Sequence, residues 1–355
     1  MTTRSQQSSA EIELVEYKDE FKENVISLWG YDKSAVYVRN KRAIWDWQYS
    51  DNPYADKISK GLVILEDGEV VAFLGNMPVM LKYGDRVVEA HWTLDGIMNP
   101  KCRGRGYGEK MYTKGVRMCK YVHLGIGMND ITEHLVKKAG CVGSDEVQQY
   151  VYSSRAEGAR GALKKALQRI IVLKKMAKRP EAGDLNVRVV DATRMPAEID
   201  LLWKKVEGEY SKIVVRDYSY MSWKYSRHPL AKYSLILVEE GSEIVGVGVF
   251  RKNAAKSRLV DYVGPANDLR IKFLIAEAFK RTCSDSDSLE CVCSDKELKT
   301  ALSFLGFRRY GDIERFYVYS KIEGDQDWEK NWFIMGGESD NDTGDYLAEY
   351  GGQEG

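Results

Sequence analysis

The sequence predicts an α/β chain built from two tandem copies of one unit, and three observations support that prediction. The chain has 355 residues, which is too many for one ordinary domain and suits two. Several segments occur twice in the same order, with alternating β-branched stretches before and after helix-like ones. Hydrophobic residues make up 44% of the chain, so two cores can be filled.

The repeat is clearest around a tryptophan. "WQYSDNP" at residues 47–53 matches "WKYSRHP" at residues 223–229. Each is followed by two alternating stretches joined by an acidic-glycine turn, "EDGE" or "EEGSE", which predicts a β-hairpin. Each copy closes on a similar strand, "GSDEVQQYVYSS" or "GDIERFYVYSK". The order predicts one domain over residues 11–155 and a second over residues 186–322.

Three segments remain outside the two copies. Residues 1–10 are polar and lack an apolar signal core, so we expect a disordered lead-in. Residues 156–185 are predicted to form a basic linker helix, because positions 160–179 hold eight Lys or Arg and no acid. The alternative is a surface that attracts an anionic membrane or a phosphorylated substrate. Residues 323–355 are predicted to form an acidic tail, mobile from Gly336 onward, although "WEKNWFIMGG" could pack on the body.

Composition excludes several classes of protein. With 53 basic and 53 acidic residues, the chain lacks the basic excess of a nucleic-acid binder. No run of 18 apolar residues exists, so no transmembrane helix is expected and a cytoplasmic location is predicted. Six cysteines without a CxxC pair predict reduced core thiols, and four histidines without ligand spacing argue against zinc. The oligomeric state is left open.

A turn rich in glycine and arginine, "CRGRGYGEKMY" at residues 102–112, follows a predicted strand and precedes a predicted helix. A helix N-terminus offers unpaired N–H groups and a partial positive charge, and phosphate is its usual guest. Walker A is absent, and the dinucleotide fingerprint fails because Glu109 stands where its third glycine belongs. The plain alternative is a surface turn with incidental arginines.

Arg103, Gly106 and Gly108 fill the pattern [QR]-x-x-G-x-[GA], so the turn resembles the pyrophosphate loop of the GNAT acyltransferase superfamily. Asn129, which opens a predicted helix, and Gly140, eleven residues later, also fit the family's spacing. The resemblance implies an α+β fold of two tandem GNAT-like domains, each a mixed, mostly antiparallel twisted sheet flanked by helices. It covers both copies in architecture but the cofactor motif only in the first.

The resemblance also implies an N-acyltransferase that uses acetyl-CoA or another acyl-CoA, such as 3-hydroxybutyryl-CoA. The N–H of Met98 is implied to polarise the thioester carbonyl, as in an oxyanion hole. The implied cofactor-binding residues are Ile97, Met98, Asn99, Arg103, Gly104, Arg105, Gly106, Tyr107, Gly108 and Asn129. The second copy has "GPANDLRIKF" in place of the loop, so we expect it to bind no coenzyme and to shape the acceptor pocket.

Direct attack by an amine needs a base, because most amines are protonated at pH 7. The candidate catalytic bases are Glu89, His91 and Asp95, which precede the loop and which strand alternation places on one face. If that face lines the cleft, the three could form a proton route. If that face packs inward, His91 is a hydrogen-bonded core residue. Asp95, beside Gly96, is equally suited to a β-bulge.

The family's usual acid for the leaving thiolate is a tyrosine at the position held here by Val136. The sequence therefore departs from the family at this point. Tyr107, Tyr150 and Tyr152 are available instead, and the last two are equally typical of strand aromatics. The assignment of the acid stays open.

Tandem chains of this layout resemble sugar N-acyltransferases of surface-polysaccharide and lipopolysaccharide synthesis. This implies an acceptor amine on a nucleotide-linked amino-deoxy sugar, for instance a dTDP-linked one. Trp45 and Trp47 suit stacking on a sugar or base, and they suit a core equally well. The alternatives are another amine (an aminoglycoside, peptide or polyamine) or a non-catalytic acyl-CoA sensor.

Overall fold

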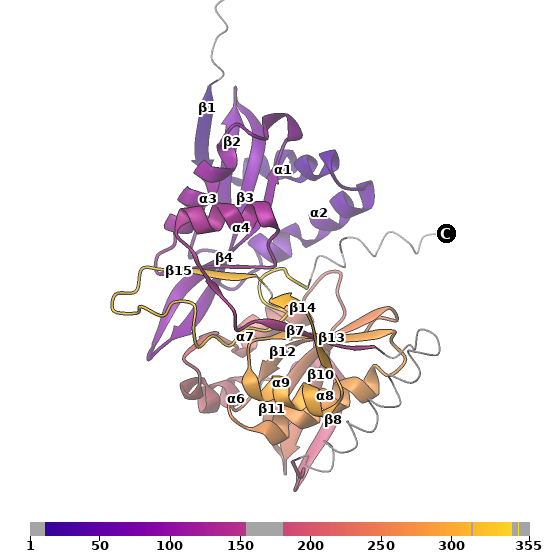
Figure 1. The fold of residues 1–355 in the computed structure, drawn as a ribbon. Coiled ribbons are helices and arrows are strands. Elements are labelled where there is room, and N and C mark those ends of the chain that lie inside the picture. Colours follow the sequence, from indigo (N-terminus) through magenta and orange to yellow (C-terminus); the bar gives the residue numbers. More distant parts are fainter. Residues whose placement is uncertain (1–10, 154–179, 314, 343–346, 348–355) are drawn as a thin grey trace, which may run out of the picture.

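The computed structural model describes residues 11–153, 180–313, 315–342 and 347. These residues form two lobes, one above the other in Figure 1, and each lobe is built on its own sheet. The predicted lead-in at residues 1–10 and the basic stretch at residues 160–179 lie outside the described residues. No helix in the described part of the chain is both long and apolar enough to cross a membrane.

The sheet of the first lobe has eight strands. Its order is β1–β2–β3–β4–β5–β15–β6, and β9 pairs with β3. Every neighbouring pair is antiparallel except β4 and β5, which confirms the mixed, mostly antiparallel sheet. The strands are β1 (Ile12–Glu16), β2 (Gly61–Glu66), β3 (Glu69–Tyr83), β4 (Arg86–Met98), β5 (Val122–Ile126), β6 (Val142–Ser144), β9 (Lys212–Val214) and β15 (Phe316–Ser320).

The sheet of the second lobe has seven strands in the order β14–β7–β13–β12–β11–β10–β8. Only β12 and β13 run parallel, so the second sheet repeats the plan of the first. The strands are β7 (Gln148–Ser153), β8 (Leu185–Asp191), β10 (Ser234–Glu240), β11 (Glu243–Arg251), β12 (Lys256–Val263), β13 (Ser288–Cys293) and β14 (Arg308–Ile313).

The two lobes exchange a strand. The last long strand of the first copy, β7, lies between β13 and β14 in the second sheet. The matching strand of the second copy, β15, lies between β5 and β6 in the first sheet (Figure 1). Neither sheet is therefore built from one continuous stretch of chain, and each lobe needs the other to complete its hydrogen bonding.

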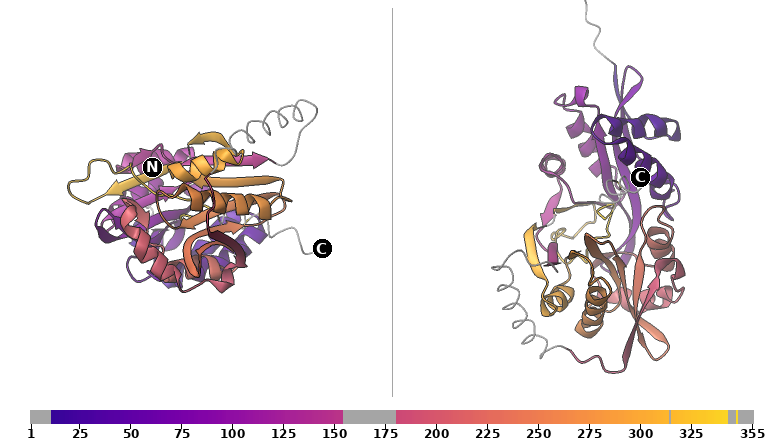
Figure 2. Two further views of the ribbon diagram at one scale, coloured as in Figure 1. Left: turned by 90° about the horizontal axis from the view of Figure 1, so that it is seen from below. Right: turned by 90° about the vertical axis from the view of Figure 1, so that its right-hand side faces the viewer.

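Helices cover both faces of each sheet (Figure 2). In the first lobe, α1 (Lys22–Leu28) and α2 (Ala35–Tyr49) pack with Phe73 on one face, and α3 (Tyr107–Arg117) packs with Leu74 on the other. Phe73 and Leu74 are neighbours on β3, so strand alternation sends them to opposite helix layers. The remaining helices are α4 (Asp130–Ala139), α6 (Ile199–Val206), α7 (Tyr218–Met221), α8 (Leu269–Thr282) and α9 (Lys296–Phe304).

The predicted hairpin turns and helix boundaries are confirmed. Asp67 and Gly68 join β2 to β3 with φ of 52° and 82°, and Gly241 turns β10 into β11 with φ of 61°. Such left-handed angles suit two-residue hairpins. Asn129 caps α4 by accepting the Thr132 N–H at 2.9 Å, and Gly140 ends it with φ of 104°.

Residues 336–342 of the acidic tail are packed, so the prediction of mobility from Gly336 is wrong for this part of it. Glu338, Ser339 and Asp342 are buried. Arg216 donates to Glu338 at 2.6 Å, and Lys224 donates to the Ser339 carbonyl at 2.7 Å. Buried cations hold this stretch in the second lobe, a long-range effect that the local composition of the tail does not reveal.

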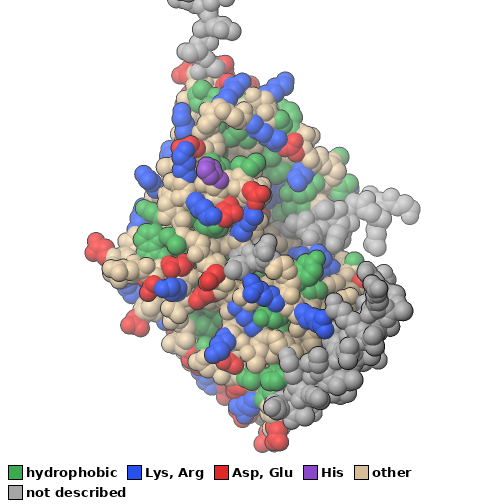
Figure 3. All heavy atoms as spheres, in the orientation of Figure 1, with side chains coloured by type: hydrophobic (Ala, Val, Ile, Leu, Met, Phe, Trp, Pro, Cys, Tyr) green, Lys and Arg blue, Asp and Glu red, His purple; other side chains and the backbone are tan. Residues whose placement is uncertain are grey.

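The surface charges and the cysteines agree with what the composition predicts. On the face drawn in Figure 3, basic and acidic side chains are interspersed, in keeping with a formal net charge of zero. All six cysteines are unpaired and buried, as predicted. Trp45 and Trp47 are only 1% and 4% exposed, so both belong to the core and neither offers a stacking surface.

Candidate functional site

The first lobe opens where β4 and β5 part. The two strands share three register pairs, from Ala90↔Val122 to Trp92↔Leu124. After that point β4 stays with β3, while Gly125 of β5 continues only with Tyr317 of β15. Two parallel strands that separate leave unpaired backbone groups along both edges of the gap.

A β-bulge marks the parting. Gly75 opposes Leu94 and Phe73 opposes Ile97, so Asp95 and Gly96 together face a single residue of β3. Asp95 has φ of 56°, a left-handed conformation that is uncommon outside glycine. The extra residue reverses the side-chain alternation beyond it.

The bulge overturns the expectation that Glu89, His91 and Asp95 share one face. Glu89 lies on the surface and pairs with Lys120 at 2.9 Å. His91 is buried, and its Nε2 lies 3.2 Å from Nδ1 of His123. Glu89 and His91 therefore follow the regular strand alternation, whereas the Asp95 side chain turns toward α2. The three side chains do not meet.

The buried histidines form a short chain toward the gap. Burial lowers the pKa of His91 to about 4 and holds the pKa of His123 well below its usual range, so both rings are neutral at pH 7. His123 Nδ1 also lies 3.1 Å from the Thr93 hydroxyl. Of these three residues, Thr93 and His123 line the gap between β4 and β5. His91 lies behind them as a hydrogen-bonded core residue.

Asp95 is enclosed by α2. Its carboxylate pairs with the fully buried Lys41 and accepts hydrogen bonds from Gln48 and Tyr49, each at 2.7 Å. The Tyr49 hydroxyl lies so close to Gly75 that a Cβ there would meet it at 2.0 Å. Asp95 is thus a fixed, fully bonded charge at the bulge.

The glycine-rich loop has the backbone expected of an anion cradle. Gly104 and Gly106 have φ of 81° and 79°, and nothing lies within 4 Å of a Cβ built on either. Gly106 is the N-cap of α3 and supplies no side-chain cap. The first N–H groups of α3 are therefore left for a ligand at the open side of the loop.

The two loop arginines are held by carboxylates. Arg103 pairs with Asp32, and Arg105 pairs with Glu66 at 2.6 Å. Both arginine side chains remain about half exposed, at 52% and 48%. The loop therefore presents backbone N–H groups as its fixed donors, with the arginines already in ion pairs beside them.

The N–H groups of β4 alternate between β3 and the gap. The Asn99 N–H donates to the Val71 carbonyl at 2.8 Å. Successive residues of a strand point their N–H groups to opposite edges. The Met98 N–H therefore points away from β3, toward the gap, as the oxyanion-hole expectation requires.

A cleft of about 830 Å³ joins the loop to the gap. It continues into a smaller cavity of about 210 Å³ between β4 and β5. Clefts of this size suit cofactor-sized ligands. The residues that line both spaces are Asp95, Gly96, Tyr112, Asn129, Thr132 and Asp340.

Most of the predicted cofactor residues border this cleft. Those that line it are Ile97, Met98, Arg103, Gly104, Gly106, Gly108 and Asn129. Asn99 instead caps the short 3₁₀ turn Pro100–Cys102 by accepting the Lys101 N–H at 3.0 Å. Tyr107 is buried at 3% exposure in the core under α3, and Arg105 pairs outward.

Tyr112 and Asp340 are among the cleft residues that sequence reasoning missed. Tyr112 projects from α3 one turn after Gly108, and a Cβ on Gly96 would meet its hydroxyl at 2.5 Å. Helical spacing from the loop could have found it. Asp340 comes from the far end of the chain, and no local signal points to it.

Tyr112 is the tyrosine beside the gap. Burial raises the pKa of its hydroxyl, which keeps it protonated at neutral pH. Val136, at the family's tyrosine position, is buried and lines the same cavity. Tyr150 and Tyr152 lie on β7 in the second sheet and pack against that lobe's core.

The second lobe has the corresponding gap, but the chain itself fills it. β12 and β13 pair over only four positions, from Lys256↔Ser288 to Leu259↔Cys291. Beyond them Gly337 donates to the Val260 carbonyl at 2.7 Å, and Met335 bridges to Cys293. The segment that enters the gap, residues 332–342, is called the C-terminal segment below.

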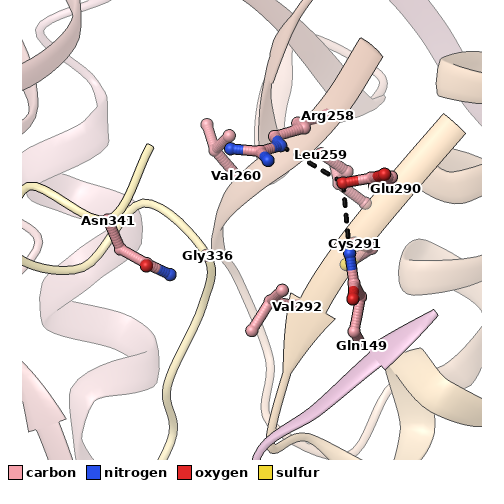
Figure 4. A pocket seen from close by; sticks show the side chains of 9 residues that line it. All are labelled: Gln149, Arg258, Leu259, Val260, Glu290, Cys291, Val292, Gly336 and Asn341. Carbon is pink, nitrogen blue, oxygen red and sulfur yellow. Dashed lines mark hydrogen bonds and ion pairs between the residues drawn. The ribbon is translucent and has the colours of Figure 1, made fainter. Parts of the chain in front are cut away.

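Figure 4 shows what remains of the second gap. The space is about 90 Å³ and is bordered by β12, β13 and the C-terminal segment. Glu290 occupies one side and binds Arg258 at 3.3 Å and Gln149 at 3.2 Å. A space this small does not admit a cofactor of nucleotide size.

The helix that follows the second gap is also closed to anions. Asp268 caps α8 by accepting the N–H groups of Arg270 and Ile271 at 2.8 and 3.3 Å. The carboxylate of Asp268 thus satisfies the first N–H groups of α8, whereas the corresponding N–H groups of α3, after Gly106, have no side-chain acceptor. Both observations support the expectation that only the first copy holds a coenzyme.

No family model matches the chain, and no curated protein matches its sequence. Its fold does match solved structures. A GCN5-related N-acetyltransferase from Anabaena variabilis aligns with a TM-score of 0.58 at 12% identity, over 87% of this chain and 72% of that one. N-myristoyltransferase of Saccharomyces cerevisiae with bound myristoyl-CoA aligns at 0.51 and 12% identity, over 90% and 84%.

The chain therefore has the GNAT acyltransferase fold. More particularly, it has the tandem form of that fold, because the whole length of a tandem GNAT protein from the clavulanic acid biosynthesis pathway aligns with it. That match covers 89% of this chain and 100% of the other, at 12% identity and a TM-score of 0.50.

Proposed function

We propose that the chain is an acyl-CoA-dependent N-acyltransferase whose first lobe holds the cofactor. The observation that carries this proposal is the open loop at the N-terminus of α3, joined by one continuous cleft to the gap beside Met98. The backbone from Arg103 to Gly108 would bind the pyrophosphate. The edge of β4 at Ile97 and Met98 would bind the pantetheine arm.

The bound cofactor supplies an acyl group activated as a thioester. The Met98 N–H, fixed by the strand, would donate to the thioester carbonyl oxygen where negative charge develops. The Tyr112 hydroxyl, beside Gly96, would give a proton to the leaving sulfur. Asp95 keeps its ion pair with Lys41 and fixes the bulge that separates the strands.

The second lobe would contribute to the acceptor side. Its own gap is filled by the C-terminal segment, and that segment reaches the cleft of the first lobe through Asp340. We propose as acceptor the amine of a nucleotide-linked amino-deoxy sugar, with acetyl or 3-hydroxyacyl as the group transferred. The tandem layout supports this acceptor, whereas Trp45 and Trp47, both in the core, lend it no support.

The test pairs acetyl-CoA and 3-hydroxybutyryl-CoA with a panel of amino sugars, nucleotide-linked amino sugars, aminoglycosides, peptides and polyamines. Release of CoA thiol and an acylated product detected by mass would support the enzyme and identify its acceptor. Acyl-CoA binding without turnover of any amine would instead favour a sensor.

A further inference from the structure

We propose that Asp340, carried by the C-terminal segment of the second lobe into the cleft of the first, binds the acceptor as an ammonium and takes its proton. This inference rests on the proposed function and names the residue that acts on the acceptor amine.

The C-terminal segment is anchored along its path to the cleft. Its early part is fixed to both lobes: the Phe333 N–H donates to the carbonyl of Lys212 on β9, a strand of the first sheet, at 2.8 Å, and Ser294 of the second lobe donates to the Trp332 carbonyl at 2.5 Å. Ile334 then accepts the Ser294 N–H at 2.9 Å. The segment is thus anchored before it reaches the cleft.

The C-terminal segment carries acidic residues at the alternate positions 338, 340 and 342. Glu338 accepts from Arg216 at 2.6 Å, inside the second lobe. Asp342 accepts from Tyr233 at 3.0 Å and from Arg251 at 3.1 Å, also in that lobe. The outer two acids are therefore anchors.

Asp340 lies between these anchors and borders the other lobe. It lines both the 830 Å³ cleft and the 210 Å³ cavity, at the point where the two spaces meet. Ser339 has φ of 56°, so the backbone turns immediately before Asp340, and the Ser339 hydroxyl donates to its carboxylate at 3.2 Å. The buried ion pairs on either side thus hold this carboxylate in place at the cleft.

Asp340 lies among charged and phenolic groups. They include the carboxylate of Asp95, the ammonium groups of Lys41 and Lys224, and the phenols of Tyr37 and Tyr49. Lys41 pairs with Asp95 and also lowers the pKa of Asp340, and Lys224 donates to the Ser339 carbonyl. Burial and the neighbouring Asp95 outweigh the effect of Lys41 and raise the pKa of Asp340, which suits a carboxylate that accepts a proton.

Asp340 takes one proton from the acceptor ammonium, which leaves a neutral amine to attack the thioester carbonyl. A C–N bond forms and the C–S bond breaks. The second proton lost by nitrogen balances the one that the leaving sulfur gains, and the proton on Asp340 returns to water.

Placement can be tested without turnover. All six native cysteines are buried, so Asp340→Cys adds one accessible thiol. We expect iodoacetamide to label this variant and S-ethyl-coenzyme A, which has no free thiol, to slow the labelling at least tenfold. Glu323→Cys, on the exposed start of the same tail, should label equally with and without the coenzyme. Equal labelling of Asp340→Cys in both conditions overturns the placement.

The role is tested with Asp340→Asn. Because a general base contributes about 100-fold or more, this variant should lose at least that factor in kcat/KM for the amine that wild type acylates. It should also lose the acidic limb of the pH profile, and should bind S-ethyl-coenzyme A within about twofold of wild type. Hydroxylamine, which is unprotonated at neutral pH, should be acylated equally by variant and wild type. Glu323→Gln is the matched control and should match wild type throughout.

The outcomes separate this inference from the proposed function. If wild type binds no S-ethyl-coenzyme A, the proposed function fails. If wild type binds it and acylates an amine, but Asp340→Asn acylates that amine at an unchanged rate, only the role of Asp340 fails.

Discussion

Trp47 and Trp223 exchange hydrogen bonds at the junction of the two lobes. The indole N–H of each donates to the backbone carbonyl of the other at 2.8 Å, and the rings stack 5.1 Å apart at 18°. Each tryptophan opens its copy of the repeated W-x-Y-S motif. The tyrosines of the motif are also equivalent. Tyr49 donates to Asp95 at the first gap, and Tyr225 donates to Asp261 at the second, both at 2.7 Å. A reciprocal contact of this kind marks a local two-fold relation between the copies.

This junction gives a first prediction. Trp47→Phe and Trp223→Phe should each lower the free energy of unfolding by about 2 kcal/mol, because each leaves one buried carbonyl without its donor and reduces the stack. The double variant should be non-additive by at least about 0.5 kcal/mol, since the two rings are in contact. Urea denaturation of all four proteins measures this. Strictly additive losses would contradict the proposed coupling.

The strand exchange makes the lobes interdependent. Residues 1–155 alone would lack β15, and β5 and β6 would then have no strand between them. We expect this fragment to be unfolded or aggregated when expressed by itself. We expect residues 180–355 to be unfolded or aggregated as well, because β13 and β14 both pair with β7, which this fragment lacks. Co-expression should yield a complex that co-purifies, and two stable, separately folded fragments would contradict the exchange.

Three buried histidines predict a dependence of stability on pH. Burial lowers the pKa of His91 to about 4 and that of His228 to about 3, and depresses that of His123 well below its usual range. As the pH falls, the histidines of the unfolded chain bind protons before those of the folded chain. The stability that the neutral, buried histidines provide is therefore fully present above about pH 6.5 and is lost as the pH falls toward 4. Each histidine contributes a slope of up to about 1.4 kcal/mol per pH unit in that window.

His91→Gln should therefore flatten the fall in unfolding free energy between about pH 6.5 and 4. His134→Gln, at an exposed position, is the control and should leave the slope as it is in wild type. Denaturation midpoints measured across this pH range test the prediction. An unchanged slope in His91→Gln would show that proton uptake by His91 does not contribute to the pH dependence.

The anchors of the C-terminal segment give a further prediction. Glu338→Gln weakens a fully buried ion pair with Arg216 and should cost about 3 kcal/mol of unfolding free energy. In an Asp340→Cys background it should also abolish the protection of the introduced thiol by the coenzyme, because the segment is no longer held. Asp327→Asn removes an exposed pair with Lys330 and should change stability by less than about 0.5 kcal/mol. Retained protection in the first variant would show that Glu338 is no anchor.

Local patterns could predict much of this fold. The hairpin turns, the helices from Leu269 and Asp130, and the glycine loop all follow from short-range chemistry at known spacing. The bulge at Asp95 could be suspected from the adjacent Gly96, yet only the pairing with β3 decides it. Its effect was large, since it removed Asp95 from the face of Glu89 and His91.

Two features lay beyond local reasoning. The exchanged strands β7 and β15 share the sequence Tyr-Val-Tyr-Ser, so neither strand alone indicates which sheet it joins. Asp340 lies in a stretch whose acidic composition suggests mobility, and only buried cations far away in sequence hold it. Both features depend on contacts between residues far apart in the sequence.

The most direct test of the central claim is a calorimetric titration of the full chain with S-ethyl-coenzyme A. We predict one site per chain, and a loss of at least tenfold in affinity in Gly106→Val, because valine both strains the loop at φ of 79° and covers the N–H groups of α3. Gly241→Val is the matched control: its φ of 61° imposes a similar strain in the other lobe, and it should bind normally. Two sites per chain, or an unchanged affinity in Gly106→Val, would contradict the account.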